Sequence, residues 1–241
     1  MSAREAIQQS VRPGETIKPW LILGPVYRDV SDEVEGLSLF ENLETSNGMP
    51  VLRKYVDEAH ALLSALPGEG DGAVIAREER KWELVRRPEK VLMWGRYNIS
   101  NHLGVALLAT VVRSPRKGRR KFRLITRISS RARVYINGNC AFDTEEDGGS
   151  RDSGRFEFEA VLDAGDHAIT VGLFRIGRMA QVGFQLTCSA ALEVRTPLPA
   201  RFSATKRAQI EADLQALRLE RDIFYDEHTV GVRLDRGLSR K

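Results

Sequence analysis

Several features are scarce in this 241-residue chain, and each scarcity excludes a class of protein. The only cysteines, Cys140 and Cys188, are far apart in apolar stretches and belong to no CxxC or CxxH pattern. This placement predicts two buried free thiols rather than a disulfide framework or a zinc site. No hydrophobic run approaches the roughly 20 residues of a membrane span, and the polar start lacks the apolar core of a signal peptide. We therefore expect a cytoplasmic protein with no membrane partner, or a secreted one if a leader has been removed.

Motifs for catalysis are also missing. The four histidines (His60, His102, His167 and His228) share no ligand spacing, and no G-x-S-x-G, H-E-x-x-H or P-loop occurs. Carboxylates are plentiful, but spacing alone gives no pair an acid or base role. We interpret the chain as non-catalytic, with no catalytic residue, metal ligand or cofactor. A glycan hydrolase with unassigned carboxylates stays open as an alternative.

The composition is that of an ordinary globular protein, with 42% apolar and 29% charged residues. The 37 basic and 33 acidic residues leave a net charge of +4, which argues against a chain that coats nucleic acid throughout. This small net charge hides a strong asymmetry. Residues 113–133 contain ten basic and no acidic residues, whereas residues 143–159 contain seven acidic and two basic ones.

Short β-rich runs separated by turn residues follow one another from about residue 74. They read WELVRR, VLMWGRYNI, GVALLATVVRS, KFRLITRISS, ARVYING, GRFEFEAVLD, HAITVGLFR and VGFQLTCSA. An earlier strand signal is WLIL at 20–23, and helical spacing of apolar residues predicts a helical insert near 51–66. Phe156 and Phe158 alternate with glutamates, and Asn137-Gly138 is a strong tight-turn signal. The pattern predicts antiparallel sheets in a sandwich or barrel.

We expect three parts along the chain: a lead-in over 1–17, a β-sandwich over 18–196, and a C-terminal part over 197–241. Within the last part, spacing predicts a helix from Ser203 to about Ile223 and a strand-like piece from Thr229 to Leu234. That helix packs against the sandwich or leads to a further domain or partner; both readings stay open.

Four local motifs resemble the galactose-binding-like jelly-roll domains attached to many glycoside hydrolases. They are WLILGP at 20–25, ISSRARVYINGN at 128–139, FEFEAVLDAGDHAITV at 156–171 and VGFQL at 182–186. The resemblance implies a mainly β fold, an antiparallel jelly-roll sandwich with a short helical insert and a C-terminal helix. It also implies a non-catalytic accessory role. The chain departs from the family at 129–131, where hydroxyls and an arginine replace an acidic pair, which puts a family metal or sugar contact there in doubt.

Sugar recognition needs flat apolar faces with a few polar groups beside them. The candidate ligand-binding residues are Trp82, Trp94, Tyr97, Asn98 and His102. The motif around Trp94 and Tyr97 is expected at a strand end, where loops carry function. The alternative is that these aromatic residues belong to the core or to the surface of a sheet.

A basic hairpin tip is the candidate anion-binding site, because guanidinium groups pair well with planar anions. Its residues are Arg116, Lys117, Arg119, Arg120 and Lys121. The alternative is a solvated loop whose charges are balanced by the acids of 143–159. No aromatic residue interleaves with the tip, so nucleic acid is not an expected partner. The segment DTEEDGGSRD superficially resembles a calcium loop, but Gly154 stands where the bidentate glutamate belongs, and an acidic surface turn is expected instead.

The sequence therefore predicts a non-catalytic carbohydrate-binding-like or accessory module of a glycan-processing system. Its expected partner is a glycan or another protein domain, and it could form an oligomer. A protein-interaction module that uses the basic hairpin at 113–133 and the C-terminal helix is the alternative from another class.

Overall fold

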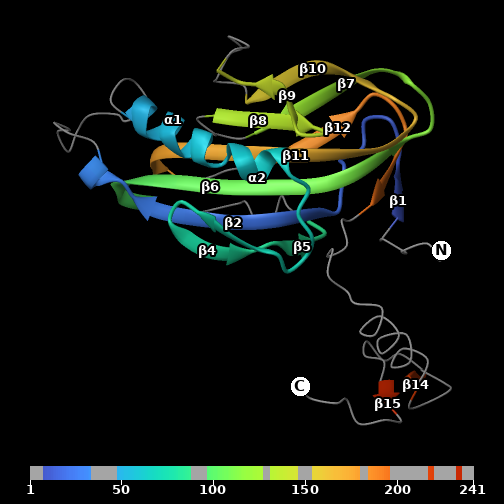
Figure 1. Ribbon diagram of the computed structural model, residues 1–241, viewed down its shortest axis with the longest axis horizontal. Coiled ribbons are helices and arrows are strands. Elements are labelled where there is room, and N and C mark those ends of the chain that lie inside the picture. Colours follow the sequence, from blue (N-terminus) through green and yellow to red (C-terminus); the bar gives the residue numbers. More distant parts are fainter. Residues whose placement is uncertain are drawn as a thin grey trace. The chain divides into compact units, whose positions relative to one another are not determined.

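Antiparallel strands dominate the computed structural model, which describes residues 8–33, 48–87, 97–126, 131–145, 154–179, 184–195, 217–219 and 232–234. The chain divides into two compact units, Met1–Pro199 and Ala200–Lys241. The first unit contains two packed sheets, two short α-helices and a small hairpin (Figure 1). Neither helix of the described part is long and apolar enough to cross a membrane.

The large sheet has eight strands in the described part. They are β1 (Gln8–Val11), β2 (Trp20–Asp29), β5 (Glu83–Val85), β6 (Tyr97–Ser114), β8 (Arg131–Ile136), β9 (Asn139–Asp143), β11 (Gly165–Met179) and β13 (Leu192–Arg195). One edge of β6 pairs with β11, which continues to β8 and β9. Its other edge pairs with β2 and, further along, with β13. The long strand β6 is thus a central strand of the sheet, paired along both of its edges.

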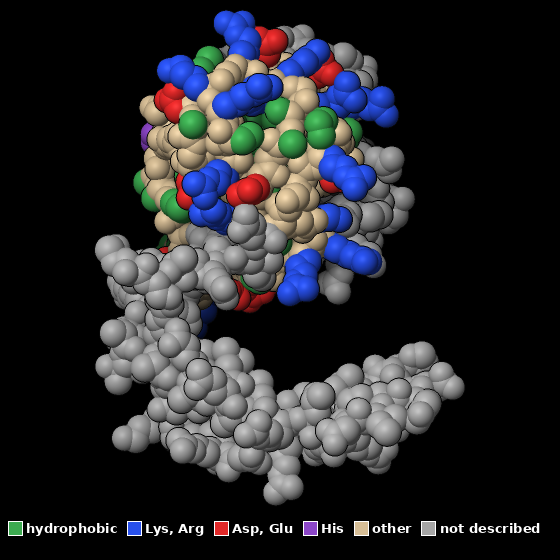
Figure 2. Space-filling view, turned by 90° about the vertical axis from the view of Figure 1, so that its right-hand side faces the viewer, with side chains coloured by type: hydrophobic (Ala, Val, Ile, Leu, Met, Phe, Trp, Pro, Cys, Tyr) green, Lys and Arg blue, Asp and Glu red, His purple; other side chains and the backbone are tan. Residues whose placement is uncertain are grey.

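The small sheet has the order β10 (Arg155–Leu162), β7 (Gly118–Ile125), β12 (Gln185–Cys188). Outside the sheets lie the 3-10 turn η1 (Ser31–Glu33), the helices α1 (Gly48–Glu58) and α2 (His60–Ser64), and a hairpin of β3 (Gly72–Ile75) and β4 (Glu78–Lys81). The segment before β2 also borders β12, since Ile17 N–H donates to the Leu186 carbonyl at 2.8 Å. Lys and Arg side chains stand out at the end of the sandwich where β6 turns into β7 (Figure 2).

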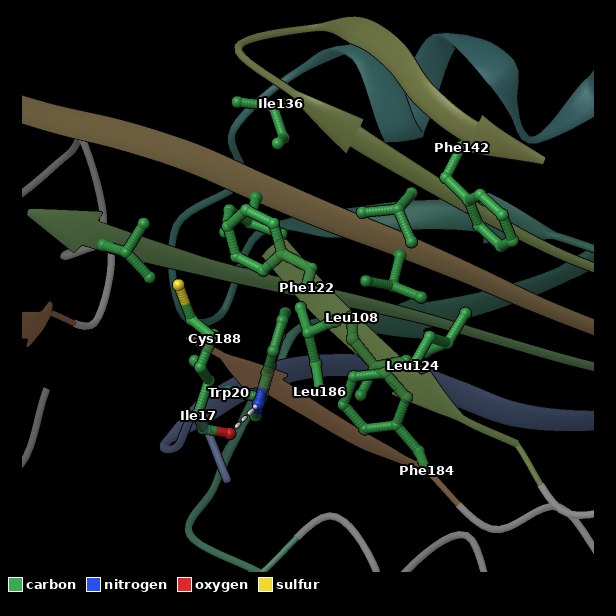
Figure 3. Close-up of a cluster of buried hydrophobic side chains, with 14 of the residues drawn as sticks. Ile17, Trp20, Leu108, Phe122, Leu124, Ile136, Phe142, Phe184, Leu186 and Cys188 are labelled. Carbon is green, nitrogen blue, oxygen red and sulfur yellow. Dashed lines mark hydrogen bonds between the residues drawn. The ribbon is translucent and has the colours of Figure 1, made fainter. Parts of the chain in front are cut away.

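The first core fills the space between the two sheets (Figure 3). Trp20 is fully buried there, donates its indole N–H to the Ile17 carbonyl at 2.6 Å, and meets Phe184 edge-on with ring centroids 5.1 Å apart. Phe158 stacks on Phe122 and on Phe142, at 5.3 and 5.0 Å between centroids. These aromatic contacts join the small sheet to the large one.

A second core lies on the opposite face of the large sheet, beneath the helices and the β3–β4 hairpin. Leu52 and Val56 of α1 are fully buried there, as are Leu21 and Leu23 of β2. Because the large sheet is covered on both faces here, the start of β2 and the middle of β6 are continuous apolar runs that do not alternate. This explains the uninterrupted sequence WLIL and the run from Val105 to Ala109.

The predicted fold class is confirmed: the chain is mainly β, with antiparallel sheets and a short helical insert. Phe156 and Phe158 face the core while Glu157 and Glu159 face solvent, as their alternation predicted. The supposed lead-in contributes strand β1, which pairs with β13.

Two expectations need correction. Cys188 is buried as predicted, but Cys140 is exposed, because it lies next to the β8–β9 turn on the outermost strand of the described sheet. In the second unit, Leu217–Leu219 forms a strand, β14, which pairs with β15 (Val232–Leu234). These three residues lie inside the window predicted to be helical, and the rest of that window lies outside the described residues.

Candidate functional site

The candidate ligand-binding residues of β6 lie at one end of the sandwich, beside the ends of two neighbouring strands (Figure 1). We call this end of the sandwich the loop end. Here β6 begins, and β2 and β11 end. Tyr97 pairs with Met179 of β11, and His102 pairs with Gly177 of β11 and with Asp29 of β2. The opening residues of β6 therefore lie in the middle of the sheet, between two neighbouring strand ends.

Most of the predicted sugar-binding residues belong to this region of the chain. Tyr97, Asn98 and His102 are in β6, and their backbone register is described while their side chains are not. Trp94 lies outside the described residues. Their role in binding stays a prediction.

Trp82 is not available in the way the sequence analysis assumed. Its side chain is only 2% exposed and packs in the second core. Its backbone is held by Asp71, whose carbonyl accepts the Trp82 N–H at 3.0 Å, and by Gly70, whose N–H donates to the Trp82 carbonyl at 2.8 Å. A ring enclosed in this way offers no open face to a sugar, so Trp82 is a core residue.

Beside the loop end, charged side chains from β2, α1 and the β3–β4 turn meet Glu33 of η1. We call this cluster the Glu33 corner. Glu33 of η1 is 13% exposed and accepts hydrogen bonds from the Tyr55 hydroxyl at 2.5 Å and from the Lys54 ammonium at 3.0 Å. Arg28 of β2 lies 3.3 Å from the same carboxylate, and Arg77 of the β3–β4 turn lies 3.6 Å away. Three cations and one phenol hydroxyl therefore contact the single carboxylate of Glu33.

The protonation of this corner follows from its contacts. Burial raises the pKa of Glu33, but the hydrogen bonds from Tyr55 and Lys54 and the charges of Lys54 and Arg77 outweigh it, so the net pKa is lowered. The pKa of Tyr55 is raised to about 12, mainly by burial and to a smaller extent by the hydrogen bond to Glu33 and the charge of Glu33. At neutral pH the carboxylate is ionised and the phenol keeps its proton.

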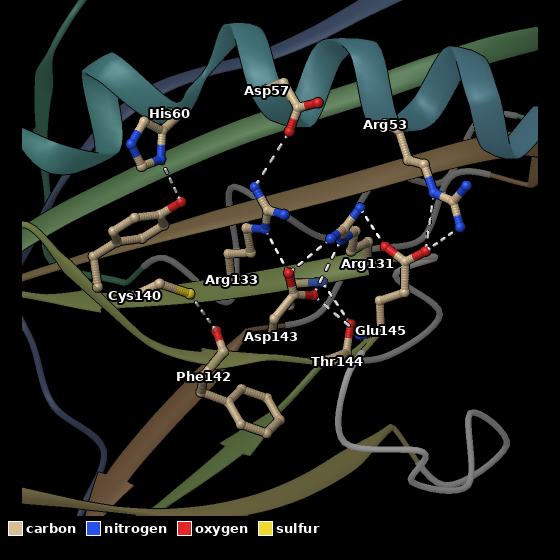
Figure 4. Close-up of polar contacts among 12 residues, drawn as sticks. Arg53, Asp57, His60, Arg131, Arg133, Cys140, Phe142, Asp143, Thr144 and Glu145 are labelled. Carbon is tan, nitrogen blue, oxygen red and sulfur yellow. Dashed lines mark hydrogen bonds and ion pairs between the residues drawn. The ribbon is translucent and has the colours of Figure 1, made fainter.

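A second charged network fastens the outer strands β8 and β9 to helix α1 (Figure 4). Arg131 and Asp143 are both buried and form a bidentate pair, with Nε to Oδ1 at 3.0 Å and Nη2 to Oδ2 at 2.7 Å. Arg133 Nε donates to Asp143 at 2.5 Å, and Glu145 lies 2.5 Å from Arg131. From α1, Arg53 reaches Glu145 at 2.6 Å. Burial by itself would raise the pKa of Asp143. The hydrogen bonds from Arg131, the Glu145 amide and Arg133 lower it by more, so the net pKa of Asp143 is lowered.

This network explains the role of Asp143 and Glu145, the described acids at the start of the acidic segment, whereas residues 146–153 lie outside the described part. Both Asp143 oxygens are engaged by guanidinium groups, and Oδ1 also accepts the Glu145 amide at 3.0 Å. No group of three or more ligating side chains that could hold a metal ion occurs among the described residues. Arg131 is the cation that these carboxylates surround.

The same side of β8 makes two further contacts with the helices. Asp57 of α1 lies 3.6 Å from Arg133, and His60 Nδ1 lies 2.9 Å from the Tyr135 hydroxyl (Figure 4). Tyr135 is buried, and burial raises its pKa. Together with the network around Asp143, these two contacts attach α1 and α2 to β8.

The basic hairpin is largely balanced by neighbouring acids, as the alternative reading proposed. Lys117 pairs with Asp163 at 2.8 Å, Arg119 with Glu159 at 3.0 Å, and Lys121 with Glu157 at 2.5 Å. These contacts follow from the pairing of β7 with β10. Figure 2 shows acidic side chains between the basic ones at this end of the sandwich.

The two remaining hairpin residues differ from the other three. Arg120 donates to the Arg116 carbonyl at 2.9 Å and lies 3.4 Å from the Ser114 hydroxyl, so its guanidinium braces the hairpin backbone. Arg116 is exposed and has no carboxylate partner among the described residues. Anion binding by this hairpin stays a prediction.

No pattern in the sequence predicts the Glu33 corner. Its residues are scattered over β2, η1, α1 and the β3–β4 turn, and none belongs to a recognisable motif. One signal was present in principle, the apolar helix face that includes Tyr55, since it predicts which side of α1 meets the sheet. It did not indicate which charged residues would meet there.

Comparison with known proteins adds a weak structural likeness to a glycoside hydrolase. No family model matches the chain, and no curated protein matches it. A β-glucuronidase from an uncultured Clostridium sp. resembles it in structure with 10% sequence identity and a TM-score of 0.35. The match covers 78% of this chain but only 30% of the β-glucuronidase, so this chain spans less than a third of that protein. A likeness at this score carries no argument about fold or function.

Proposed function

We propose that this chain is a non-catalytic carbohydrate-binding-like module of a glycan-processing system, and that it binds glycan at the loop end. Two packed antiparallel sheets provide the rigid frame that such modules require. The four motifs that resemble galactose-binding-like jelly-roll domains support the same role.

The observation that carries the proposal is the register of β6. His102 pairs with the last residue of β2 and with Gly177 of β11, and the segment from Tyr97 to Asn101 continues past the end of β2 along β11. Residues 97–102 hold three of the predicted ligand residues, and Trp94 precedes them by only a few positions. An aromatic residue, amides and an imidazole at adjoining strand ends are the groups that sugar recognition uses.

A protein-interaction role for the basic hairpin has less support. Lys117, Arg119 and Lys121 already have acidic partners, which leaves less of the hairpin charge for a second molecule. Retention on a heparin column would reveal such a role.

The test is a glycan array read beside a heparin column, with wild-type protein and the variants Trp94→Ala, His102→Ala and Arg119→Ala. We expect glycan retention in wild type and in Arg119→Ala, and its loss in Trp94→Ala and His102→Ala. Far-UV circular dichroism establishes that each variant is folded.

Two results would contradict the proposal. Salt-sensitive heparin retention that is lost in Arg119→Ala, without any glycan signal, would favour the interaction role. Turnover of an oligosaccharide would refute the non-catalytic part.

A further inference from the structure

The Glu33 corner carries more positive charge than its single carboxylate balances. Arg28, Lys54 and Arg77 all lie within 4 Å of Glu33, so among the described residues of the corner three cations face one carboxylate. Two nearby carboxylates are engaged elsewhere: Glu78 pairs with Arg80, and Asp29 accepts hydrogen bonds from Ser31. Asp32, the other carboxylate of η1, is exposed and contacts none of the three cations in the described part.

The arginines of the corner have hydrogen-bond donors to spare. At 3.3 and 3.6 Å, the contacts of Arg28 and Arg77 with Glu33 are ion pairs, and neither forms a hydrogen bond with it. Arg28 Nε is buried and has no hydrogen-bond partner among the described residues. A guanidinium group only donates, and a buried donor without an acceptor is costly. Arg28 therefore adds positive charge to the corner while its Nε–H forms no hydrogen bond with the described residues.

Two of the cations can reach an incoming group. The side chains of Lys54 and Arg77 are 46% and 54% exposed, while Glu33 is recessed at 13%. A ligand arriving from solvent therefore meets the lysine and the arginine before the carboxylate. This order favours an anion over a cation.

The turn that carries Arg77 is backbone-strained. Ala76 and Arg77 have φ values of 47° and 62°, in the left-handed region that two-residue hairpin turns fill with Asn and Gly. The β8–β9 turn has the same conformation and uses Asn137 and Gly138. The left-handed conformation is unfavourable for residues other than Gly and Asn. The β3–β4 turn keeps an arginine in this conformation at the place where its side chain reaches the corner.

We propose that the Glu33 corner binds an anionic group of a glycan, a carboxylate or a sulfate, through Lys54 and Arg77, with the charge of Arg28 adding to the attraction. This inference rests on the proposed glycan-binding function and specifies its ligand as an acidic glycan. The corner and the proposed glycan site share a strand end, although successive strand residues point to opposite faces, because Arg28 pairs with Leu103 and the next residue, Asp29, pairs with His102. The corner thus adjoins the strand ends of the proposed glycan site.

The test measures binding of three oligosaccharides of equal length, one neutral, one with uronate residues and one sulfated, by isothermal titration calorimetry. Wild type is compared with Lys54→Gln and Arg77→Gln, and with Arg80→Gln as a matched control. Arg80 lies on the same hairpin, is similarly exposed and already pairs with Glu78. We expect the two corner variants to bind the acidic glycans about tenfold more weakly, as for the loss of one charged contact worth about 1.4 kcal/mol. The neutral glycan and the control variant are unaffected, and the two acidic probes distinguish carboxylate from sulfate.

The failure of this inference is separate from the failure of the proposed function. Binding of the neutral glycan with no preference for either acidic one would overturn the corner and leave the function standing. Loss of all three glycans to the same extent in Arg77→Gln would also overturn it, because the arginine would then only position the hairpin.

If wild type binds no glycan, the proposed function fails, and inorganic sulfate tests the corner by itself. We expect sulfate to raise the melting temperature of wild type and of Arg80→Gln more than that of the Lys54→Gln/Arg77→Gln double variant. An equal rise in all three proteins would mean that the corner binds no anion.

Discussion

Asp143 shows how a single carboxylate can organise buried charge in this protein. It is almost fully buried and holds the guanidinium groups of Arg131 and Arg133, while Arg131 also meets Glu145. Charges removed from water are tolerated only when they are paired in this way. The consequence is a strong dependence on each partner.

Asp143→Asn is expected to destabilise the fold by about 3–5 kcal/mol, because it leaves Arg131 buried with one partner fewer. Urea denaturation at pH 7 measures the loss. Glu159→Gln, which removes an exposed partner of Arg119, is the control and should leave the midpoint almost unchanged. A similar midpoint for the two variants would show that the buried pair contributes nothing.

The pH dependence of the same comparison has a definite sign. Because the pKa of Asp143 is lower in the folded protein than its ordinary value of 3.8, the unfolded chain binds the proton more readily. The contribution of Asp143 is therefore complete well above pH 3.8 and is lost as the pH falls through the folded pKa. We expect the stability difference between wild type and Asp143→Asn to shrink between pH 6 and pH 3. A constant difference over this range would contradict the assignment.

Among the elements, the β8–β9 hairpin is constrained by its turn and by the helix beside it. Asn137 accepts the Ala168 amide at 3.0 Å and lies 3.0 Å from His167 Nδ1. Gly138 has φ of 79°, and a Cβ placed on it would lie 2.8 Å from the Ser64 carbonyl oxygen. Turn geometry and close approach to α2 both require glycine here.

Gly138→Ala is expected to cost roughly 2 kcal/mol, about half from the positive φ and the remainder from displacement of the Ser64 carbonyl. Gly14→Ala is the matched control, because Gly14 has φ of 82° with nothing within 4 Å of the added Cβ. Thermal denaturation of both variants isolates the steric part. Equal melting temperatures would show that α2 moves aside without cost.

At the scale of the sandwich, aromatic contacts form part of the apolar core between the two sheets. Phe158 lies between Phe122 of its own sheet and Phe142 of the other. Both cores share the large sheet, so strain at either face is transmitted through the same strands.

Phe158→Ala should therefore destabilise the protein by about 3–5 kcal/mol, as other Phe→Ala cavities do. Val161→Ala, on the same strand but 59% exposed, should change stability by at most about 0.5 kcal/mol. Guanidinium unfolding followed by circular dichroism compares them. Equal costs would mean that β10 does not pack on the large sheet.

The sequence by itself determined the class of the fold, because short β-rich runs, alternation as in Arg155–Glu159 and the Asn137-Gly138 turn are local signals. It also placed the helical insert correctly. Only the tertiary structure decided which charged residues meet. The Glu33 corner, the Arg131–Asp143 pair and the burial of Trp82 all join residues from separate elements, and periodicity specifies which face of an element is buried but not which side chains meet across it.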